Sequence, residues 1–95
     1  MAVKIIIKRK VRKGKEGPLL PLLLELRSRA ITQPGYISGE TLRNVDDPED
    51  HLVIGTWQSV EDWKAWEANP GRAEIQSKID ALLGETTSYA MYYHG

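Results

Sequence analysis

The 95-residue sequence predicts one α+β domain, spanning residues 1–95, with strands and helices in the order β-α-β-β-α-β. Segments rich in β-branched and aromatic residues alternate with segments in which apolar residues recur every three or four positions. The chain is long enough for one hydrophobic core and contains no internal repeat. In a compact domain, this order most naturally gives an antiparallel four-stranded sheet with both helices on one face, the ferredoxin-like arrangement.

Four segments have the composition of strands: Val3–Lys8, Tyr36–Asn44, Leu52–Trp57 and Glu85–His94. The first contains three consecutive isoleucines, which indicates a central strand covered on both faces. Gly39 interrupts the second strand and indicates a β-bulge. The acidic residues 46–50 are expected to form a hairpin loop that leads into the third strand.

The first helix is predicted to begin at Pro18 and to end near Ala30, with Pro21 still in its first turn, where backbone donors lack partners. Its apolar stripe consists of Leu19, Leu22, Leu23, Leu26 and Ala30. Three more apolar residues widen this stripe beyond what one sheet contact needs: Leu20, Leu24 and Ile31. We therefore expect this helix to face a second surface as well as the sheet.

The second helical region is predicted to begin near Val60, because Ser59 followed by Asp62 forms a capping box. Trp63 and Trp66 then lie on one helical face, which points back toward the preceding strand.

Residues 69–71, Asn-Pro-Gly, interrupt this helix. The helix is expected to restart with Pro70 in its first turn and to run to Leu83, with Gly84 as its stop. The apolar stripe of this second part consists of Ile75, Ile79, Leu82 and Leu83.

Composition excludes several classes of protein. The absence of cysteine excludes disulfides, thiolate catalysis and zinc ribbons. Residues 1–30 hold nine Lys or Arg against two Glu, yet no nucleic-acid motif accompanies them. The basic run Lys8–Lys15 is therefore expected to be a solvated strand end and loop, or to contact the acidic residues 46–50. No segment approaches the roughly 20 apolar residues of a membrane span, and no signal-peptide cleavage site follows the leucines, so we expect a cytoplasmic protein.

The first strand has apolar residues on both faces, with Val3, Ile5 and Ile7 on one side and Ile6 on the other. Helices cover only one face of a ferredoxin-like sheet. Because an apolar sheet face is normally a partner surface, the sequence predicts a homodimer whose two sheets pack face to face.

The stretch from Thr56 to Ile75 resembles the antibiotic biosynthesis monooxygenase domain family. The similarity lies in the strand-ending Trp57, the Ser59 cap, the aromatic helix and the break at Pro70, and by element order it covers nearly the whole chain. The resemblance implies a dimeric α+β barrel. It also implies oxygenation without a cofactor, in which an electron-rich phenol or hydroquinone reacts with dioxygen once it is deprotonated.

Two departures from the family pattern bear on the reaction. Quinol-oxidising members commonly have histidines at the positions held here by Trp66 and Gly71. Haem-degrading members keep a tryptophan matching Trp66, but their axial histidine matches Gln76, and their first-strand asparagine has no counterpart in Val3–Lys8. An amide is a poor ligand for iron, so the interpretation as a haem-degrading protein loses its metal ligand.

A site for a phenolic substrate needs aromatic walls, a group that stabilises the phenolate and a dry cavity. Trp66 is the candidate wall and indole donor, Asn69 the amide and Arg72 the positive charge. Further candidates for substrate contact are Trp63, Tyr36, Arg43 and Asn44. Structural interpretations compete with these roles: the two tryptophans as core, Arg72 as a surface charge and Asn69 as a turn residue. No cofactor and no metal ion is expected.

The two histidines have open roles. His51 follows acidic residues at 46, 47, 49 and 50, but two histidines without ligand spacing are no metal signature, so a solvated loop is the preferred interpretation. His94 is either a frayed terminal residue or a base, if the last strand lines a pocket.

Two functions from different classes follow. The first is a cofactor-independent monooxygenase acting on a small aromatic or quinol-like molecule between the helices and the sheet. The second is a non-catalytic dimer that binds a small apolar ligand or serves as an interaction module, and the missing helix histidines favour it. Haem degradation ranks third.

Overall fold

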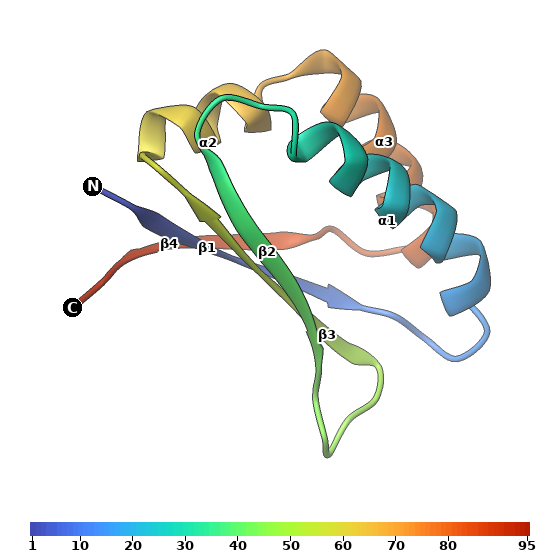
Figure 1. Cartoon of the computed structure of the whole chain (residues 1–95). Coiled ribbons are helices and arrows are strands. Elements are labelled where there is room, and N and C mark those ends of the chain that lie inside the picture. The colour runs from blue at the N-terminus through green and yellow to red at the C-terminus, as the bar shows by residue number, and fades with distance from the viewer.

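The computed structural model describes residues 1–95 and confirms the predicted fold class (Figure 1). Four strands form one antiparallel sheet in the order β2-β3-β1-β4, and three helices lie on one side of it. The elements in chain order are β1 (Val3–Lys10), α1 (Glu16–Ala30), β2 (Tyr36–Arg43), β3 (Asp50–Trp57), α2 (Val60–Glu67), α3 (Pro70–Leu83) and β4 (Ser88–Tyr93). α1 and α3 pack against each other over the sheet, and both chain ends emerge on the same side.

The pairing of the strands divides the helix-covered face into four cross-strand rows. Directly paired residues of antiparallel strands point to the same side of a sheet. Numbered from the start of β1, and running from β1 through β3 to β2, the rows are as follows: Val3, Trp57 and Tyr36; Ile5, Gly55 and Gly39; Ile7, Val53 and Thr41; Arg9, His51 and Arg43. Row one is aromatic, row two has two glycines, and row four is basic.

β1 and β3 each extend two residues further into charged sequence than predicted. Arg9 of β1 pairs with His51 of β3, and Lys10 pairs with Asp50. Charged side chains do not indicate a strand in the sequence. The hydrogen bonds between strands come from the backbone, so the strands can continue through charged residues.

The bulge in β2 lies between Tyr36 and Ser38, and not at Gly39 as predicted. Gly39 pairs directly with Gly55 in regular register. Position 39 favours glycine for a different reason, because a Cβ atom there would lie 2.9 Å from the hydroxyl oxygen of Tyr36. Gly39 thus leaves room for the tyrosine side chain that lies along the strand.

α1 begins at Glu16, two residues before the predicted start, and no side chain caps it. Pro21 consequently lies in the second turn and not in the first. Its missing N–H leaves the carbonyl of Gly17 without the usual helical donor.

The capping signals of the second helical region are confirmed. The Ser59 hydroxyl oxygen accepts from the Asp62 backbone N–H at 3.1 Å, and the hydroxyl donates to the Asp62 carboxylate at 3.0 Å. Asn69 caps α3, Pro70 occupies its first turn, and Gly84 ends it in the left-handed conformation with φ of 71°.

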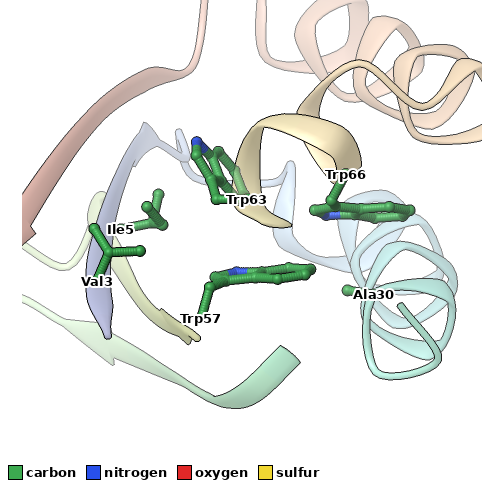
Figure 2. Packing of buried hydrophobic residues seen from close by; sticks show 6 residues of the cluster. All are labelled: Val3, Ile5, Ala30, Trp57, Trp63 and Trp66. Atoms are coloured by element: carbon green, nitrogen blue, oxygen red, sulfur yellow. The ribbon is translucent and has the colours of Figure 1, made fainter. Parts of the chain in front are cut away.

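The core consists of two clusters. The first joins row one to the helices and contains Val3, Ile5, Ala30, Trp57, Trp63 and Trp66. Figure 2 shows the indoles of Trp57 and Trp66 reaching toward Ala30 of α1, with Trp63 nearer to Ile5. The second cluster lies between α1 and α3 and contains Val11, Leu19, Ile75, Ile79 and Leu83. Neither cluster includes the β2 and β3 residues of rows two and three.

No element covers the other face of the sheet (Figure 1). The strand register places Ile6, Leu52, Ile54 and Ala90 there, next to one another on β1, β3 and β4. No helix of the structure is both long and apolar enough to cross a membrane.

Candidate functional site

A cavity of about 290 Å³ lies between α1 and the β2 and β3 side of the sheet. Its floor is formed by Ile7, Arg9, Tyr36, Gly39, Thr41, Val53, Gly55 and Trp57, which come from all four rows. Its roof is formed by Leu20, Leu23, Leu24, Leu26 and Arg27 of α1. A concave site with a mostly apolar lining and a few polar groups suits a small aromatic molecule.

The cavity exists because two glycines face each other in row two. Gly39 and Gly55 are direct partners on adjacent strands, so the middle of the floor has no side chains there. A Cβ atom at position 39 would lie only 2.9 Å from the Tyr36 hydroxyl oxygen, and one at position 55 would make an ordinary contact of 3.5 Å with Trp57 Nε1. The floor is therefore a stretch of bare backbone between an aromatic end and a basic end.

The aromatic end presents two polar atoms toward the bare floor. Tyr36 and Trp57 pack edge to face with ring centroids 5.4 Å apart. The Tyr36 hydroxyl lies next to Gly39 and the Trp57 indole nitrogen lies next to Gly55, and both residues line the cavity. Tyr89 carries the only tyrosine hydroxyl with a hydrogen-bond partner in the structure. The Tyr36 hydroxyl is thus available to a ligand.

The roof accounts for the wide apolar stripe of the first helix. Leu20 and Leu24 are 55% and 58% exposed, although both border the cavity. They are the residues that widen the stripe beyond what the packing of α1 on the core uses. Arg27 ties this helix to the floor by donating to the Gly39 carbonyl at 3.1 Å. The apolar surface of α1 on this side of the cavity is therefore not covered by any other part of the chain.

The basic end begins with Arg9, which is only 6% exposed. Its Nε atom is buried without a hydrogen-bond partner, and Arg9 takes part in none of the three ion pairs of the structure. Burial lowers the pKa of the Arg9 guanidinium from its ordinary value; nearby Tyr89 and Asp80 oppose this effect, and Arg72 adds to it. Arginine stays protonated in proteins, so a buried positive charge without an ion-pair partner borders the cavity.

His51 and Arg43 complete row four. They border a second hollow of about 350 Å³ that shares Leu20, Leu23 and Thr41 with the first. His51 is half-buried, and its Nε2 atom is buried without a partner. Arg43 is exposed at the outer end of the row. The two hollows form one groove under α1, with the basic row along its end.

The residues predicted as catalytic lie together at the junction of α2 and α3, and none of them lines the cavity. Trp66 is buried in the first core cluster with Trp63. The Asn69 side-chain oxygen accepts from the backbone N–H groups of Gly71 at 2.8 Å and of Arg72 at 3.2 Å. Its amide oxygen is thus engaged in capping α3.

Arg72 is buried and not a surface charge, with 6% of its surface exposed. Its guanidinium lies 5.5 Å from the ring centre of Trp63 and 5.1 Å from that of Tyr89, and it donates to the Tyr89 hydroxyl. Cation–π contacts of this kind stabilise the packing of the aromatic rings.

The three candidates for substrate contact from the predicted second strand lie in three different places. Tyr36 lines the cavity, and Arg43 borders the second hollow. Asn44 belongs to the hairpin loop, where its side chain donates to Asp50 at 3.0 Å and accepts from the backbone of Asp46 at 2.8 Å. No group of three or more histidine or acidic side chains lies close enough to hold a metal ion, and His94 is exposed beyond β4.

Sequence reasoning missed Arg9, Trp57 and the glycine pair as parts of one site. A signal for Arg9 was present, because it follows Ile7 at the two-residue spacing that puts it on the inward face of β1. The opposition of Gly39 and Gly55 depends on the register of β2 against β3, which the bulge after Tyr36 sets.

The comparison with known proteins agrees with this fold. The model of the family described as "Antibiotic biosynthesis monooxygenase" matches residues 2–78. The chain belongs to this family. The resemblance seen in the stretch from Thr56 to Ile75 is thereby confirmed.

Structural neighbours share the family fold over almost their whole length. SnoaB from Streptomyces nogalater, described as a cofactor-independent oxygenase, has a TM-score of 0.86 at 17% identity, with 99% of this chain and 93% of that chain covered. A conserved protein from Methanosarcina mazei Go1 has a TM-score of 0.90 at 17% identity, with 100% and 94% covered. At such identities the likeness establishes the fold alone.

One curated relative of this chain is Protein SchA from Streptomyces halstedii. It is 21% identical over 86 residues, which are 90% of this chain and 23% of SchA. The chain therefore spans about a quarter of the length of that relative.

Replacing Arg9 by methionine should stabilise the unliganded protein. Methionine keeps the apolar stem but removes a buried charge without a partner, so we expect the free energy of unfolding to rise by about 1–3 kcal/mol and the melting midpoint by several degrees. Thermal and urea melts of Arg9→Met against wild type measure this.

Arg12→Met is the matched control, because Arg12 is 60% exposed and pairs only with exposed Glu85. It should change stability by less than about 0.5 kcal/mol. Loss of stability in Arg9→Met would mean that the protein itself satisfies the guanidinium, and the basic end would not be a ligand site.

Proposed function

We propose that the protein is a cofactor-independent monooxygenase that oxidises a small phenol or hydroquinone in the cavity under α1. The observation that carries the proposal is the cavity itself. It combines an apolar interior, two hydrogen-bonding atoms on aromatic walls and a buried cation at the opposite end. Membership in the antibiotic biosynthesis monooxygenase family supports the class of reaction.

In this proposal the aromatic ring of the substrate lies between the leucines of α1 and the bare backbone of Gly39 and Gly55. Its oxygen points to the Tyr36 hydroxyl and the Trp57 indole N–H, which lie over these glycines. Hydrogen-bond donors fixed in the site favour the phenolate over the phenol. The charge of Arg9 acts in the same direction, because charges interact more strongly in a weakly polar interior than in water.

The phenolate supplies the electrons for the reaction. One electron passes from the phenolate to dioxygen, and the resulting superoxide forms a C–O bond with the ring carbon para to the phenolic oxygen. The intermediate is a hydroperoxide, which loses water and leaves a second carbonyl. The net change converts a phenol and dioxygen into a quinone and water, with one oxygen atom in each product. The site contributes by binding and orienting the ring and by favouring the anion.

The residues first chosen from the sequence receive a positioning role in this proposal. Arg72 packs Trp63 against Tyr89, and Trp63 lies 5.9 Å from Trp57 with its ring at an angle of 63°. Trp66 fills the same core cluster, and Asn69 fixes the start of the helix that carries Arg72. These residues hold Trp57, which contacts the substrate.

A non-catalytic ligand-binding protein is the second candidate function. Trp66 and Gly71 replace the histidines found in quinol-oxidising members, and Trp66 is packed in the core. Such a protein would use the same cavity for binding alone.

We further propose that two copies associate through the uncovered sheet face. The face presents Ile6, Leu52, Ile54 and Ala90 side by side on three strands. Removing apolar surface of this kind from water favours association of two copies.

A charge in the middle of this face should separate the copies. Ile54→Asp is expected to convert a dimer into a monomer in sedimentation velocity at micromolar concentration, because an unpaired carboxylate is costly to bury. Ile31→Asp places the same charge on a residue at the end of α1 that is 55% exposed, and should leave the dimer intact. A wild-type protein that sediments as a monomer would refute this association.

Oxygen uptake tests the enzymatic proposal. With 1-naphthol and a chelator present, wild-type protein should consume oxygen above the buffer rate, and ¹⁸O₂ should label one quinone oxygen. Thr41→Trp fills the cavity and should lower kcat/KM by roughly tenfold or more, because the ring no longer reaches Tyr36. Ala81→Trp, on the exposed face of α3, is the control. Binding of 1-naphthol without oxygen uptake would favour the ligand-binding protein.

A further inference from the structure

We infer that a row of aromatic side chains forms an electron-transfer path between the cavity and β4, and that this path protects the protein from radicals formed during oxygenation. The path runs through Tyr36, Trp57, Trp63 and Tyr89, in that order. Its geometry is independent of the reaction in the cavity, whereas its protective role rests on the proposed function.

The four rings form an unbroken series of contacts across the protein. The ring centroids lie 5.4 Å apart from Tyr36 to Trp57, 5.9 Å from Trp57 to Trp63 and 5.9 Å from Trp63 to Tyr89. All three separations fall in the range of roughly 4.5–7 Å that is typical of aromatic rings in contact. Since the chain has no cysteine, tryptophan and tyrosine are its side chains that lose one electron most readily. Electrons pass rapidly between such rings when they touch.

The ends of the path lie in different surroundings from its middle. Tyr36 on β2 is half-buried and lines the cavity together with Trp57. Trp57 and Trp63 are each 2% exposed, and both belong to the first core cluster (Figure 2). Tyr89 is half-buried on β4, the edge strand farthest from β2. Two buried indoles thus connect the cavity to the opposite edge of the sheet.

Arg72 favours Tyr89 over Trp63 as the end of the path. Its guanidinium lies 5.5 Å from the ring centre of Trp63 and 5.1 Å from that of Tyr89. A positive charge so close disfavours the radical cation that an indole forms when it loses an electron. Tyrosine instead loses its phenolic proton with the electron and stays neutral. Arg72 is the donor in its hydrogen bond with Tyr89, so the O–H proton of the tyrosine is free to pass to water.

The radicals that the path removes come from the hydroperoxide intermediate. Homolysis of its O–O bond, in place of the loss of water, gives an alkoxyl and a hydroxyl radical. Each radical needs one electron and one proton to become an alcohol and water. Trp57, which lines the cavity, supplies the electrons one at a time, and water supplies the protons.

The remaining steps restore the protein. Trp63 reduces the oxidised Trp57, and Tyr89 then reduces Trp63 and releases its phenolic proton to water. A thiol in solution donates a hydrogen atom to the tyrosyl radical, and two of the resulting thiyl radicals combine as a disulfide. In sum, one hydroperoxide and two thiols give one alcohol, one water and one disulfide.

Light-driven oxidation tests the path without substrate. Because the chain has no cysteine, Ile37→Cys provides a single attachment point for a ruthenium photo-oxidant, at a residue that is 49% exposed and follows Tyr36. A flash in the presence of a soluble electron acceptor and a nitroso spin trap should give a radical adduct on Tyr89, located by tandem mass spectrometry. Absence of this adduct would overturn the inference.

Two variants of the labelled protein interrupt the path. Trp63→Phe keeps a ring but removes the indole, and it should lose the adduct on Tyr89 while retaining one on Tyr36. Tyr89→Phe changes only the half-buried end, and its adducts should shift to Tyr36 and the two indoles. Tyr92→Phe is the matched control, because Tyr92 is 57% exposed on the opposite face of β4, and the adduct on Tyr89 should persist. An adduct on Tyr89 that survives in Trp63→Phe would contradict the path.

Turnover tests the protective role separately. With 1-naphthol and a thiol present, Tyr89→Phe should lose activity after fewer turnovers than wild type and accumulate oxidised Trp57, whereas Tyr92→Phe should match wild type. Equal numbers of turnovers in Tyr89→Phe and wild type would refute the protective role. Failure of the wild type to take up oxygen would reject the proposed function, and trapping of the light-driven radical on Tyr89 would still establish the path.

Discussion

The opposition of two glycines in adjacent strands is the constraint on which the site depends. Gly39 and Gly55 face each other in the middle of the helix-covered side of the sheet. One end of that side is filled by three tryptophans, and the second core cluster fills the space between α1 and α3. Because row two has no side chains on β2 and β3, a cavity of about 290 Å³ remains between α1 and this part of the sheet.

The same constraint orients the aromatic residues of row one. Tyr36 and Trp57 line the cavity, with the hydroxyl oxygen next to Gly39 and the indole nitrogen next to Gly55. Trp63, Trp66 and Arg72 support this arrangement from behind. The α2 and α3 junction thus acts through Trp57, and its composition reflects packing more than direct contact with a ligand.

Arg9 gives the cavity its chemical character. A buried cation without a partner destabilises the unliganded fold, and proteins retain such groups mainly where function requires them. On the same row, Arg43 adds a second positive charge at the exposed outer end. Stability and ligand recognition are therefore opposed at this position.

The fold was predictable because the relevant signals are local. The Ser59 cap, the break at Pro70, the stop at Gly84 and the strand composition each depend on a few neighbouring residues, and the structure confirms them. The start of α1 and the position of the bulge were wrong, because no side chain caps Glu16 and the unpaired residue of β2 is an ordinary isoleucine.

The site was less predictable than the fold, because it depends on register. Tyr36 was recognised as a candidate for substrate contact, and it lines the cavity. Trp57 and the glycine pair come together only through the pairing of β2 with β3. Periodicity alone could have placed Arg9 on the inward face, but the charged run around it favoured a solvated strand end. The catalytic roles of Trp66, Asn69 and Arg72 stay predictions.

A crystal structure of the protein soaked in 1-naphthol without oxygen would show directly where a phenol binds. We expect the ring over Gly39 and Gly55, with the phenolic oxygen within hydrogen-bonding distance of Tyr36 and Trp57. A ligand bound at the junction of α2 and α3, or a floor closed by Leu20 and Leu24 of α1, would contradict the account.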